Sequence, residues 1–318
     1  MKKFLLLALA LAAATITFTA ASAADERQSV LVTGASSGIG RNLTEMLAEN
    51  GYHVYAGARK DEDLAALDAI DNVTAVRLDV TRQDHVDAVV DLIRDKGTGL
   101  YGLVNNAGVG GGGPVLETPI DEQTFVYTVN VEGVYRTTRA FAPLVIESGG
   151  RIVTTGSIAG TLSPMTYSSY SGSKHWIESF TDSLAAEMEP HGVSVSVVEP
   201  GSYKSQIRRS SAARRLEEVA AAGGEVTEDM RKSYEATAER ELSYKEPDEV
   251  SAAFMHALFD DAPLRRYLVV PAPDQQEATI AKQISELAEL NQWGPYRYSR
   301  DELVRMLDKA LAGETPAE

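Results

Sequence analysis

Two residues of this 318-residue chain, Tyr170 and Lys174, have the side chains and the spacing needed for acid–base chemistry. Residues four positions apart on a helix share one face, with Cβ atoms roughly 5–6 Å from each other. A phenol ordinarily has a pKa near ~10, which makes it a poor proton donor or acceptor at neutral pH. A neighbouring ammonium favours the phenolate, so we expect Lys174 to lower the pKa of Tyr170 toward the working range.

Ser157 is a further candidate because it follows an apolar segment, residues 151–155, that predicts a strand. A hydroxyl at the carboxyl end of that strand can donate a hydrogen bond to a substrate carbonyl oxygen. Asn130, in a segment that predicts a helix over 125–147, completes a set of four polar candidates.

The elements that must position these side chains begin with the stretch T-G-A-S-S-G-I-G at 33–40, between an apolar run and a helical pattern. A strand, a glycine-rich turn and a helix N-terminus in this order form a phosphate site, because free N–H groups and the helix dipole attract anions. The first glycine allows the tight turn, and the second allows a pyrophosphate to approach the backbone closely. The last glycine allows the helix to pack against the strand. The candidate cofactor contacts of this stretch are Gly34, Ser36, Ser37, Gly38, Ile39 and Gly40.

The same stretch also matches G-x-S-x-G, the nucleophile elbow of α/β-hydrolases, with Ser36 as the nucleophile. Two enzyme classes therefore compete for these residues. A hydrolase elbow should follow several strands and be followed by an acid and then a histidine. Because this stretch follows the first predicted strand, we favour dinucleotide binding and interpret Ser36 as a turn hydroxyl.

Three later strand ends supply further candidate cofactor contacts. Where a dinucleotide fold has an acidic residue for the ribose 2′-OH of NAD, this chain has Ala58, followed by Arg59. A guanidinium can pair bidentately with a 2′-phosphate, which favours NADP, with NAD as the alternative. Asp79 can accept a hydrogen bond from an adenine amino group while Val80 packs on the ring. The segment after the fourth strand, Asn106, Ala107 and Gly108, can form a wall of the cofactor pocket.

From residue 29 onward, strand-like and helix-like patterns alternate. The predicted strands cover 30–33, 53–58, 73–78, 102–105, 151–155, 193–198 and 267–270. The predicted helices cover 41–50, 61–69, 83–96, 125–147, 167–190 and 248–259. Such alternation with β-branched strands indicates a parallel sheet covered on both faces, a doubly wound, Rossmann-type α/β fold. We expect a single domain over 24–318, with a charged, helix-prone insertion at 202–246 and two helices within 272–318.

Composition excludes several classes of function. The formal net charge of −16 argues against nucleic acid or an anionic membrane as a partner. The chain contains no cysteine, which excludes disulfides, thiolate catalysis and cysteine-bound metal. Its five histidines show no metal-ligand spacing, so no metal site is expected.

Residues 1–23 have the pattern of a secretory signal peptide, with Lys2 and Lys3 before an apolar core and A-S-A at 21–23. We expect cleavage after Ala23 and a periplasmic or secreted mature chain. The alternative is an uncleaved membrane anchor, since the apolar run nearly reaches spanning length. Both alternatives place the domain outside the cytoplasm.

The motifs T-G-x-x-x-G-x-G, N-N-A-G and Y-x-x-x-K, with the asparagine and serine between them, resemble the short-chain dehydrogenase/reductase family over about residues 29–205. The resemblance implies that Tyr170 is the acid in carbonyl reduction and the base in alcohol oxidation. It also implies that Lys174 binds the nicotinamide ribose and depresses the Tyr170 pKa, and that Ser157 orients and polarises the substrate oxygen. Asn130 would position a water that links Lys174 to solvent.

The same resemblance implies cofactor contacts after the sixth predicted strand. Pro200 and Gly201 stand in the family's register, and Ser205 takes the place of a threonine that bonds the nicotinamide carboxamide. Because the hydroxyl is retained, we expect this contact to be retained as well. Family members usually form dimers or tetramers through the two long helices around the fifth strand, so a homo-oligomer is expected.

The segment 137–192 and V-E-P-G at 198–201 resemble the retinol and hydroxysteroid branch of the family, which implies a hydrophobic secondary alcohol or ketone as substrate. We expect the insertion at 202–246 to close over that substrate as a lid. Its arginines are typical of a solvated helix face, and the alternative is that they meet an anionic substrate. These arginines are Arg208, Arg209, Arg214 and Arg215. The non-enzymatic alternative is an exported dinucleotide-binding or sensing protein on the same fold, and a serine hydrolase is least favoured.

Overall fold

The computed structural model describes residues 28–221 and 223–314. The predicted signal peptide at 1–23 lies outside these residues. Over the described ranges, no helix combines the length and the apolar character needed to cross a membrane.

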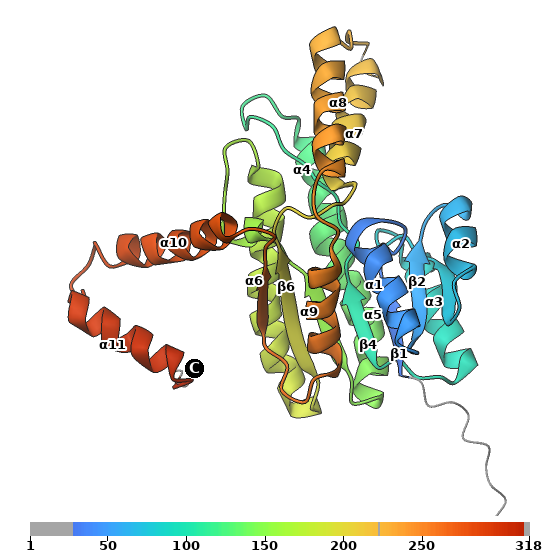
Figure 1. The fold of residues 1–318 in the computed structure, drawn as a ribbon, viewed down its shortest axis with the longest axis horizontal. Helices are drawn as coiled ribbons and strands as arrows, with labels where there is room; N and C mark the ends of the chain where they lie inside the picture. The colour runs from blue at the N-terminus through green and yellow to red at the C-terminus, as the bar shows by residue number, and fades with distance from the viewer. Residues whose placement is uncertain (1–27, 222, 315–318) are drawn as a thin grey trace, which may run out of the picture.

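A seven-stranded parallel sheet forms the centre of the molecule, with strand order β3-β2-β1-β4-β5-β6-β7. All seven predicted strands are confirmed, and β6 extends two residues beyond its predicted end. The strands are β1 (Ser29–Val32), β2 (His53–Ala58), β3 (Val73–Arg77), β4 (Gly102–Asn105), β5 (Arg151–Thr155), β6 (Ser194–Pro200) and β7 (Arg266–Val269). This is the predicted doubly wound fold (Figure 1).

Helices cover both faces of the sheet, and most lie where the sequence pattern predicts them. The α-helices are α1 (Gly38–Glu49), α2 (Asp61–Asp68), α3 (Gln83–Lys96), α4 (Ile120–Tyr127), α5 (Gly133–Glu147), α6 (Ser168–Met188), α7 (Ile207–Ala221), α8 (Glu228–Leu242), α9 (Asp248–Phe259), α10 (Pro273–Leu290) and α11 (Arg300–Leu311). Short 3₁₀ turns lie at Ile158–Gly160 and Glu189–His191.

The predicted helix over 125–147 is the element that differs most from expectation. The helical segment begins earlier, at Ile120, and a π-helical turn at Thr128–Glu132 separates α4 from α5. Such turns widen the helix by one residue and are frequent at functional sites. Helix α1 also begins earlier than predicted, at Gly38, so the last glycines of the loop belong to its first turn.

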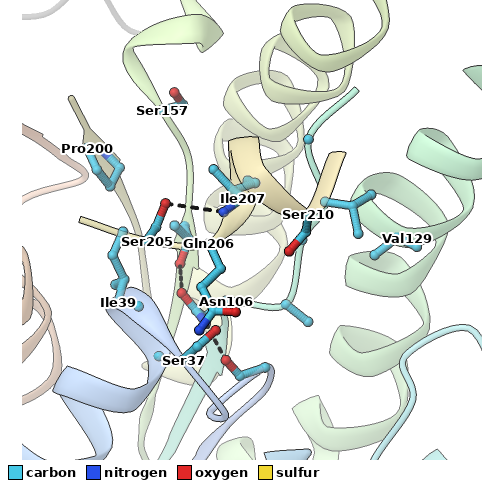
Figure 2. Close-up of a pocket in the computed structure, with 18 of the residues that line it drawn as sticks. Ser37, Ile39, Asn106, Val129, Ser157, Pro200, Ser205, Gln206, Ile207 and Ser210 are labelled. Atoms are coloured by element: carbon cyan, nitrogen blue, oxygen red, sulfur yellow. Dashed lines mark hydrogen bonds between the residues drawn. The ribbon is translucent and has the colours of Figure 1, made fainter. Parts of the chain in front are cut away.

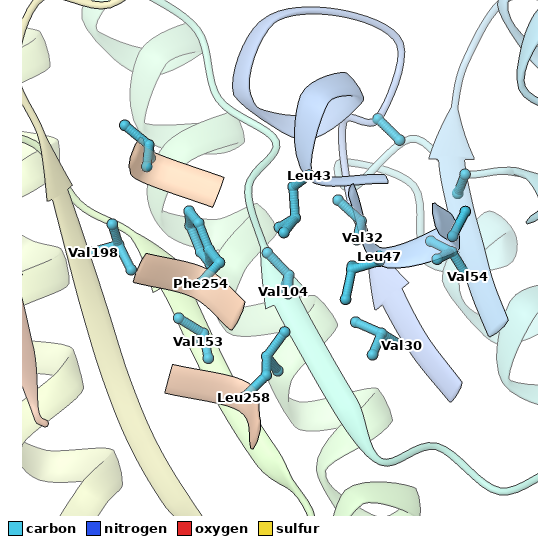
Figure 3. Close-up of a cluster of buried hydrophobic side chains, with 14 of the residues drawn as sticks. Val30, Val32, Leu43, Leu47, Val54, Val104, Val153, Val198, Phe254 and Leu258 are labelled. Carbon is cyan, nitrogen blue, oxygen red and sulfur yellow. The ribbon is translucent and has the colours of Figure 1, made fainter. Parts of the chain in front are cut away.

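The sheet buries an apolar layer on each face, because successive residues of a strand point to opposite sides. On one face, valines of the strands pack against α1 and α9, as Figure 3 shows for Leu43, Leu47, Phe254 and Leu258. On the other face, Leu31 belongs to a second cluster with side chains of α3, α5 and α6.

The strand order reverses beside β1, which pairs with both β2 and β4. Chain connections leave opposite faces of the sheet at such a point, and the crevice outside the carboxyl ends of the strands is where ligands of open α/β sheets bind.

Two helical segments project beyond the sheet layers. The insertion forms a hairpin of α7 and α8 that stands above the carboxyl ends of the strands, and the predicted C-terminal helices are α10 and α11 (Figure 1).

Candidate active site

The loop between β1 and α1 makes two close backbone contacts that only glycine allows. Gly34 has a φ of +67°, and a Cβ atom there would lie 2.8 Å from the Cα of Ala107. A Cβ on Gly40 would lie 2.3 Å from the carbonyl oxygen of Gly34. Distances below 3.0 Å are not tolerated, so both positions exclude every larger residue. The loop is thereby held against the end of β4.

Asn106 and Thr33 tie this loop to β4. The Asn106 side-chain Nδ2 donates to the carbonyl oxygens of Thr33 at 3.0 Å and Gly34 at 3.1 Å. The Thr33 hydroxyl oxygen accepts from the main-chain N–H groups of Asn106 and Ala107, each at 2.9 Å. The amide of Asn106 therefore supports the loop, a role that the sequence pattern alone did not distinguish from pocket lining.

Tyr170 and Lys174 lie on successive turns of α6, as predicted from their spacing. Lys174 is buried, and its Nζ donates to the carbonyl oxygen of Thr155, at the end of β5, over 2.7 Å. The same nitrogen lies 5.8 Å from the centre of the Tyr170 ring. The contact with β5 fixes the ammonium on the sheet side of the phenol.

The protonation equilibria of this pair differ from expectation. Burial raises the pKa of the Tyr170 phenol, and the Ser157 hydroxyl and the Arg208 guanidinium oppose this only in part. Burial also lowers the pKa of Lys174 to about 8, against the effect of the Glu178 carboxylate. Desolvation disfavours the charged form of both groups, so the pKa of Tyr170 is raised and not lowered as predicted.

Glu178 is a half-buried carboxylate that the sequence analysis missed, although it lies one helical turn beyond Lys174. Its Oε2 accepts from Arg266 Nε at 3.2 Å, and its Oε1 has no hydrogen-bond partner among the described residues. Burial and the neighbouring Glu178 raise the pKa of Glu199 to about 7, with Arg266 acting in the opposite sense. The i, i+4 spacing from Lys174 was the signal for Glu178, whereas the sequence carried no signal that Glu199 would lie beside it.

Ser157 follows β5 and caps the 3₁₀ turn behind it. Its Oγ accepts from the main-chain N–H of Ala159 at 3.0 Å, which leaves the hydroxyl proton available for a second partner. The serine lines the same cleft as Tyr170. Its role as a donor to a substrate oxygen stays a prediction.

Asn130 lies in the π-helical turn and is placed differently from the other three candidates. Its Oδ1 accepts from Val109 N at 2.8 Å, while its Nδ2 donates to Val109 O and to Ser173 Oγ, both at 3.0 Å. The side chain is buried and does not line the cleft. The amide therefore joins the loop after β4 to α6, and its hydrogen-bonding groups are already used.

One cleft of about 640 Å³ at the carboxyl ends of the strands contains every other predicted site residue. These are Gly34, Ser36, Ser37, Gly38, Ile39, Gly40, Arg59, Asp79, Val80, Asn106, Ala107, Gly108, Ser157, Tyr170, Lys174, Pro200, Gly201 and Ser205. Figure 2 shows Ser37, Asn106, Ser157 and Ser205 around it, with Ile207 from the start of α7. Among the residues that line it there is no histidine, which leaves Ser36 without the base that a hydrolase needs.

The end of the cleft near β2 carries the residues predicted to select the nucleotide. Arg77 donates from Nη1 to the carbonyl oxygen of Arg59 at 2.6 Å and pairs with Asp61, which fixes the backbone of Arg59. The Asp79 Oδ1 accepts from the N–H and the hydroxyl of Thr81. Burial raises the pKa of Asp79, but these hydrogen bonds and the charges of Arg59 and His85 together keep the net pKa below its ordinary value.

The cradle fits a nicotinamide dinucleotide. Its loop excludes side chains at Gly34 and Gly40, and Ser37 is the N-cap of α1 with a hydroxyl that makes no capping hydrogen bond. A free hydroxyl and unpaired N–H groups at a helix N-terminus suit a pyrophosphate.

Comparisons with known proteins agree with this geometry. A family model described as "short chain dehydrogenase" matches residues 28–216. The chain is 34% identical over 261 residues to the mitochondrial D-beta-hydroxybutyrate dehydrogenase of Bos taurus, covering 76% of each chain. It is 32% identical over 260 residues to 3beta-hydroxysteroid dehydrogenase dhs-16 of Caenorhabditis elegans, covering 75% of this chain and 67% of that one. A solved short chain dehydrogenase/reductase from Burkholderia phymatum in complex with NAD is 26% identical, with a TM-score of 0.71, over 86% of this chain and 98% of that one.

The matched segment begins at β1 and ends within α7, so it contains the cradle, the tyrosine–lysine pair and Ser157. The protein thus belongs to the short-chain dehydrogenase family and is an NAD(P)-dependent oxidoreductase that acts on CH–OH groups.

Proposed function

We propose that this enzyme interconverts a secondary alcohol and a ketone or aldehyde with NADP(H), using Tyr170 as its acid and base. The observation that carries the proposal is the placement of Tyr170 and Lys174 on successive turns of α6, facing the cleft that the glycine cradle closes. A phenol there can reach a substrate oxygen that Ser157 also contacts.

The chemistry follows from these side chains. When bound, the nicotinamide dinucleotide supplies a hydride to a carbonyl carbon or accepts one from an alcohol carbon. In reduction, Ser157 donates a hydrogen bond to the carbonyl oxygen, and Tyr170 gives its phenolic proton to that oxygen as the C=O bond becomes CH–OH. In oxidation, the Tyr170 phenolate takes the proton back. The Lys174 ammonium, held by Thr155, stabilises the phenolate through its charge and would bind the ribose.

Asn130 contributes to this proton path through its backbone in our proposal. Its side chain is committed to Val109 and Ser173, so a water linked to Lys174 would have to bind a main-chain carbonyl of the π-helical turn. Such turns break the regular i→i+4 pattern, which frees carbonyl groups for water.

Replacing the phenolic hydroxyl tests the catalytic assignment. We expect Tyr170→Phe to lower kcat by about 10²–10⁴-fold on a panel of alcohols and ketones, because the proton donor is lost. Its affinity for NADPH should be retained. Tyr52→Phe, which removes a hydroxyl outside the cleft, is the matched control. Binding of NADPH without turnover of any panel member by the wild type would favour the sensing alternative.

We propose NADP over NAD because β2 ends at Ala58, where an NAD site has a carboxylate, and the next residue, Arg59, lines the cleft. Fluorescence titration of the full chain with NADPH and NADH measures this preference directly. We expect tighter binding of NADPH, lost in Arg59→Ala while the affinity for NADH is kept. An equal loss of affinity for both nucleotides would show that Arg59 does not recognise the 2′-phosphate.

For the substrate we propose a molecule with an apolar carbon skeleton. The cleft that contains Tyr170 is lined in part by apolar side chains, among them Val109, Ile158, Leu162, Pro164 and Ile207. Two relatives are named for a hydroxybutyrate and a 3beta-hydroxysteroid, which are both secondary alcohols. Helix α7 lines the cleft, and the hairpin of α7 and α8 would close over the substrate as a lid.

We also propose that the chain is exported and works as a homo-oligomer. The signal-peptide pattern at 1–23 supports export, and alkaline phosphatase fused after residue 318 would be active only outside the cytoplasm.

A shallow cleft between α3, α5 and α6, lined by Tyr135 and Trp176, supports assembly through α5 and α6. Light scattering of the purified chain tests it.

A further inference from the structure

The four arginines at the start and middle of α7 do not share one environment. Arg214 is neutralised within the protein, because its Nη2 contacts Glu122 Oε1 and the carbonyl oxygen of Gly110, both at 2.8 Å. Its guanidinium also lies over the ring of Phe125, 4.5 Å from the centre. Arg214 therefore fastens the hairpin to the loop after β4 and is unavailable to a ligand.

Arg208 lines the catalytic cleft and has no such counter-ion. Its Nη1 donates to the hydroxyl of Tyr167 at 3.0 Å, and its guanidinium carbon lies 5.8 Å from the centre of that ring. Over residues 28–221 and 223–314, no carboxylate comes within ion-pair distance of it. An arginine carries five N–H donors, so most donors of this exposed side chain make no hydrogen bond to the described residues.

The buried acid at this end of the hairpin does not neutralise the guanidinium. Glu241 on α8 accepts from the main-chain N–H groups of Arg208 at 2.7 Å and Arg209 at 3.0 Å, one with each oxygen. These bonds fix the backbone of Arg208 at the start of α7 while leaving its side chain in the cleft. The position of the arginine is thus set before any ligand arrives.

Arg208 and Tyr170 line the same cleft. The positive charge of Arg208 is one of the influences that oppose the rise in the pKa of Tyr170. Tyr167, which holds Arg208, precedes Tyr170 by three residues at the start of α6. A group bound to Arg208 would lie beside the substrate oxygen that meets Tyr170.

We infer that Arg208 binds a carboxylate of the substrate, so that the enzyme interconverts hydroxy acids and oxo acids. This inference rests on the proposed function and names its substrate class. A carboxylate accepts two parallel N–H bonds from a guanidinium, and the apolar lining of the cleft accommodates the carbon chain between carboxylate and carbonyl. The carboxylate itself takes no part in the reaction, because only the C=O and CH–OH groups are interconverted.

Matched acids and esters test the inference. We would measure kcat/KM with NADPH for 2-, 3- and 4-oxopentanoate and for their methyl esters, which keep the ketone and remove the charge. The wild type should prefer at least one acid over its ester. Arg208→Gln should lower kcat/KM for that acid about 10- to 100-fold and for the ester less than threefold, since a charge-assisted pair is lost only with the acid.

Two controls separate this site from its neighbours. Arg231→Gln removes one positive charge from the exposed face of α8 and should change neither substrate. The Kd for NADPH, measured by fluorescence, should be the same in Arg208→Gln and the wild type. Weaker NADPH binding with an unchanged acid-to-ester ratio would assign Arg208 to the cofactor and overturn the inference.

Failure of the inference is distinguishable from failure of the proposed function. Turnover of the esters alone, or an equal loss for acid and ester in Arg208→Gln, would leave the dehydrogenase standing and reject the carboxylate. If no oxopentanoate turns over, calorimetric titration of the wild type and Arg208→Gln with the three acids in the presence of NADP⁺ decides. Absence of binding by the wild type, or equal binding by both proteins, rejects the inference. The proposed function fails only if the broader panel shows no turnover that Tyr170→Phe removes.

Discussion

Glu241, near the end of α8, accepts hydrogen bonds from the first turn of α7 through the main-chain N–H of Arg208, at 2.7 Å. The N–H groups at the start of a helix have no partner within the helix, and a carboxylate there also complements the helix dipole. One buried side chain thus holds together a hairpin that projects from the sheet and borders the cleft.

Removing this carboxylate should loosen the hairpin. We expect Glu241→Ala to cost about 1–2 kcal/mol of local stability, as for the loss of an N-cap, and to speed amide exchange in α7 about tenfold. Hydrogen–deuterium exchange resolved by peptide measures this. Glu239→Ala, on the exposed face of α8, should have no such effect. Equal protection of α7 in all three proteins would contradict the assignment.

A substitution of Ser37 can distinguish an effect on cofactor binding from an effect on the free energy of unfolding. Because its hydroxyl makes no capping hydrogen bond in α1, Ser37→Ala should change the free energy of unfolding by less than about 0.5 kcal/mol. If the hydroxyl contacts a cofactor phosphate, the Kd for NADPH should rise about tenfold, the effect of losing a hydrogen bond to a charged group. Denaturant titration and fluorescence titration of the same sample give both numbers. An unchanged Kd would remove Ser37 from the cofactor contacts.

The raised pKa of Glu199 predicts how the free energy of unfolding depends on pH. Its pKa is raised to about 7 by burial and by Glu178, whereas an ordinary glutamate has 4.5, so between these values the native state holds a proton that the unfolded chain has released. Stability from this group is therefore fully present below about pH 4.5 and is lost as the pH rises through 7. The complete loss is on the order of 3 kcal/mol.

Glu199→Gln should abolish this dependence. Relative to the wild type, the variant should gain about 2–3 kcal/mol between pH 5 and pH 8, because glutamine keeps the volume but does not ionise. Urea unfolding at several pH values measures the difference. Glu187→Gln, on the exposed side of α6, is the control. Parallel curves for wild type and Glu199→Gln would show that the carboxylate titrates normally.

Thr166 adopts a left-handed backbone conformation with a φ of 72°, which is costly for a β-branched residue. Its carbonyl oxygen accepts from Gly113 N at 2.6 Å, so this conformation connects the loop after β4 to the start of α6. Asparagine tolerates such a φ, and Thr166→Asn should stabilise the protein by about 1 kcal/mol. Thr166→Val keeps the branching and should give no gain in the midpoint of denaturant unfolding. A gain of equal size in both variants would exclude backbone strain as its cause.

The sequence by itself determined the fold and most members of the site. Apolar strands alternating with amphipathic segments specify a parallel sheet, and the carboxyl ends of its strands must then share one edge. That is why the glycine loop, Arg59, Asp79, Ser157 and the Tyr170–Lys174 pair could be assigned to one cleft from their places after successive strands.

The tertiary structure alone decided what each group is free to do. The Asn130 amide bonds to Val109 and Ser173, and burial raises the pKa of Tyr170. Within the described part of the chain, no carboxylate pairs with Arg208 as Glu122 does with Arg214. None of this could be read from spacing, because burial and hydrogen-bond partners come from segments distant in the chain. Sequence periodicity places a residue on an element, whereas its charge and its available donors depend on everything that packs around it.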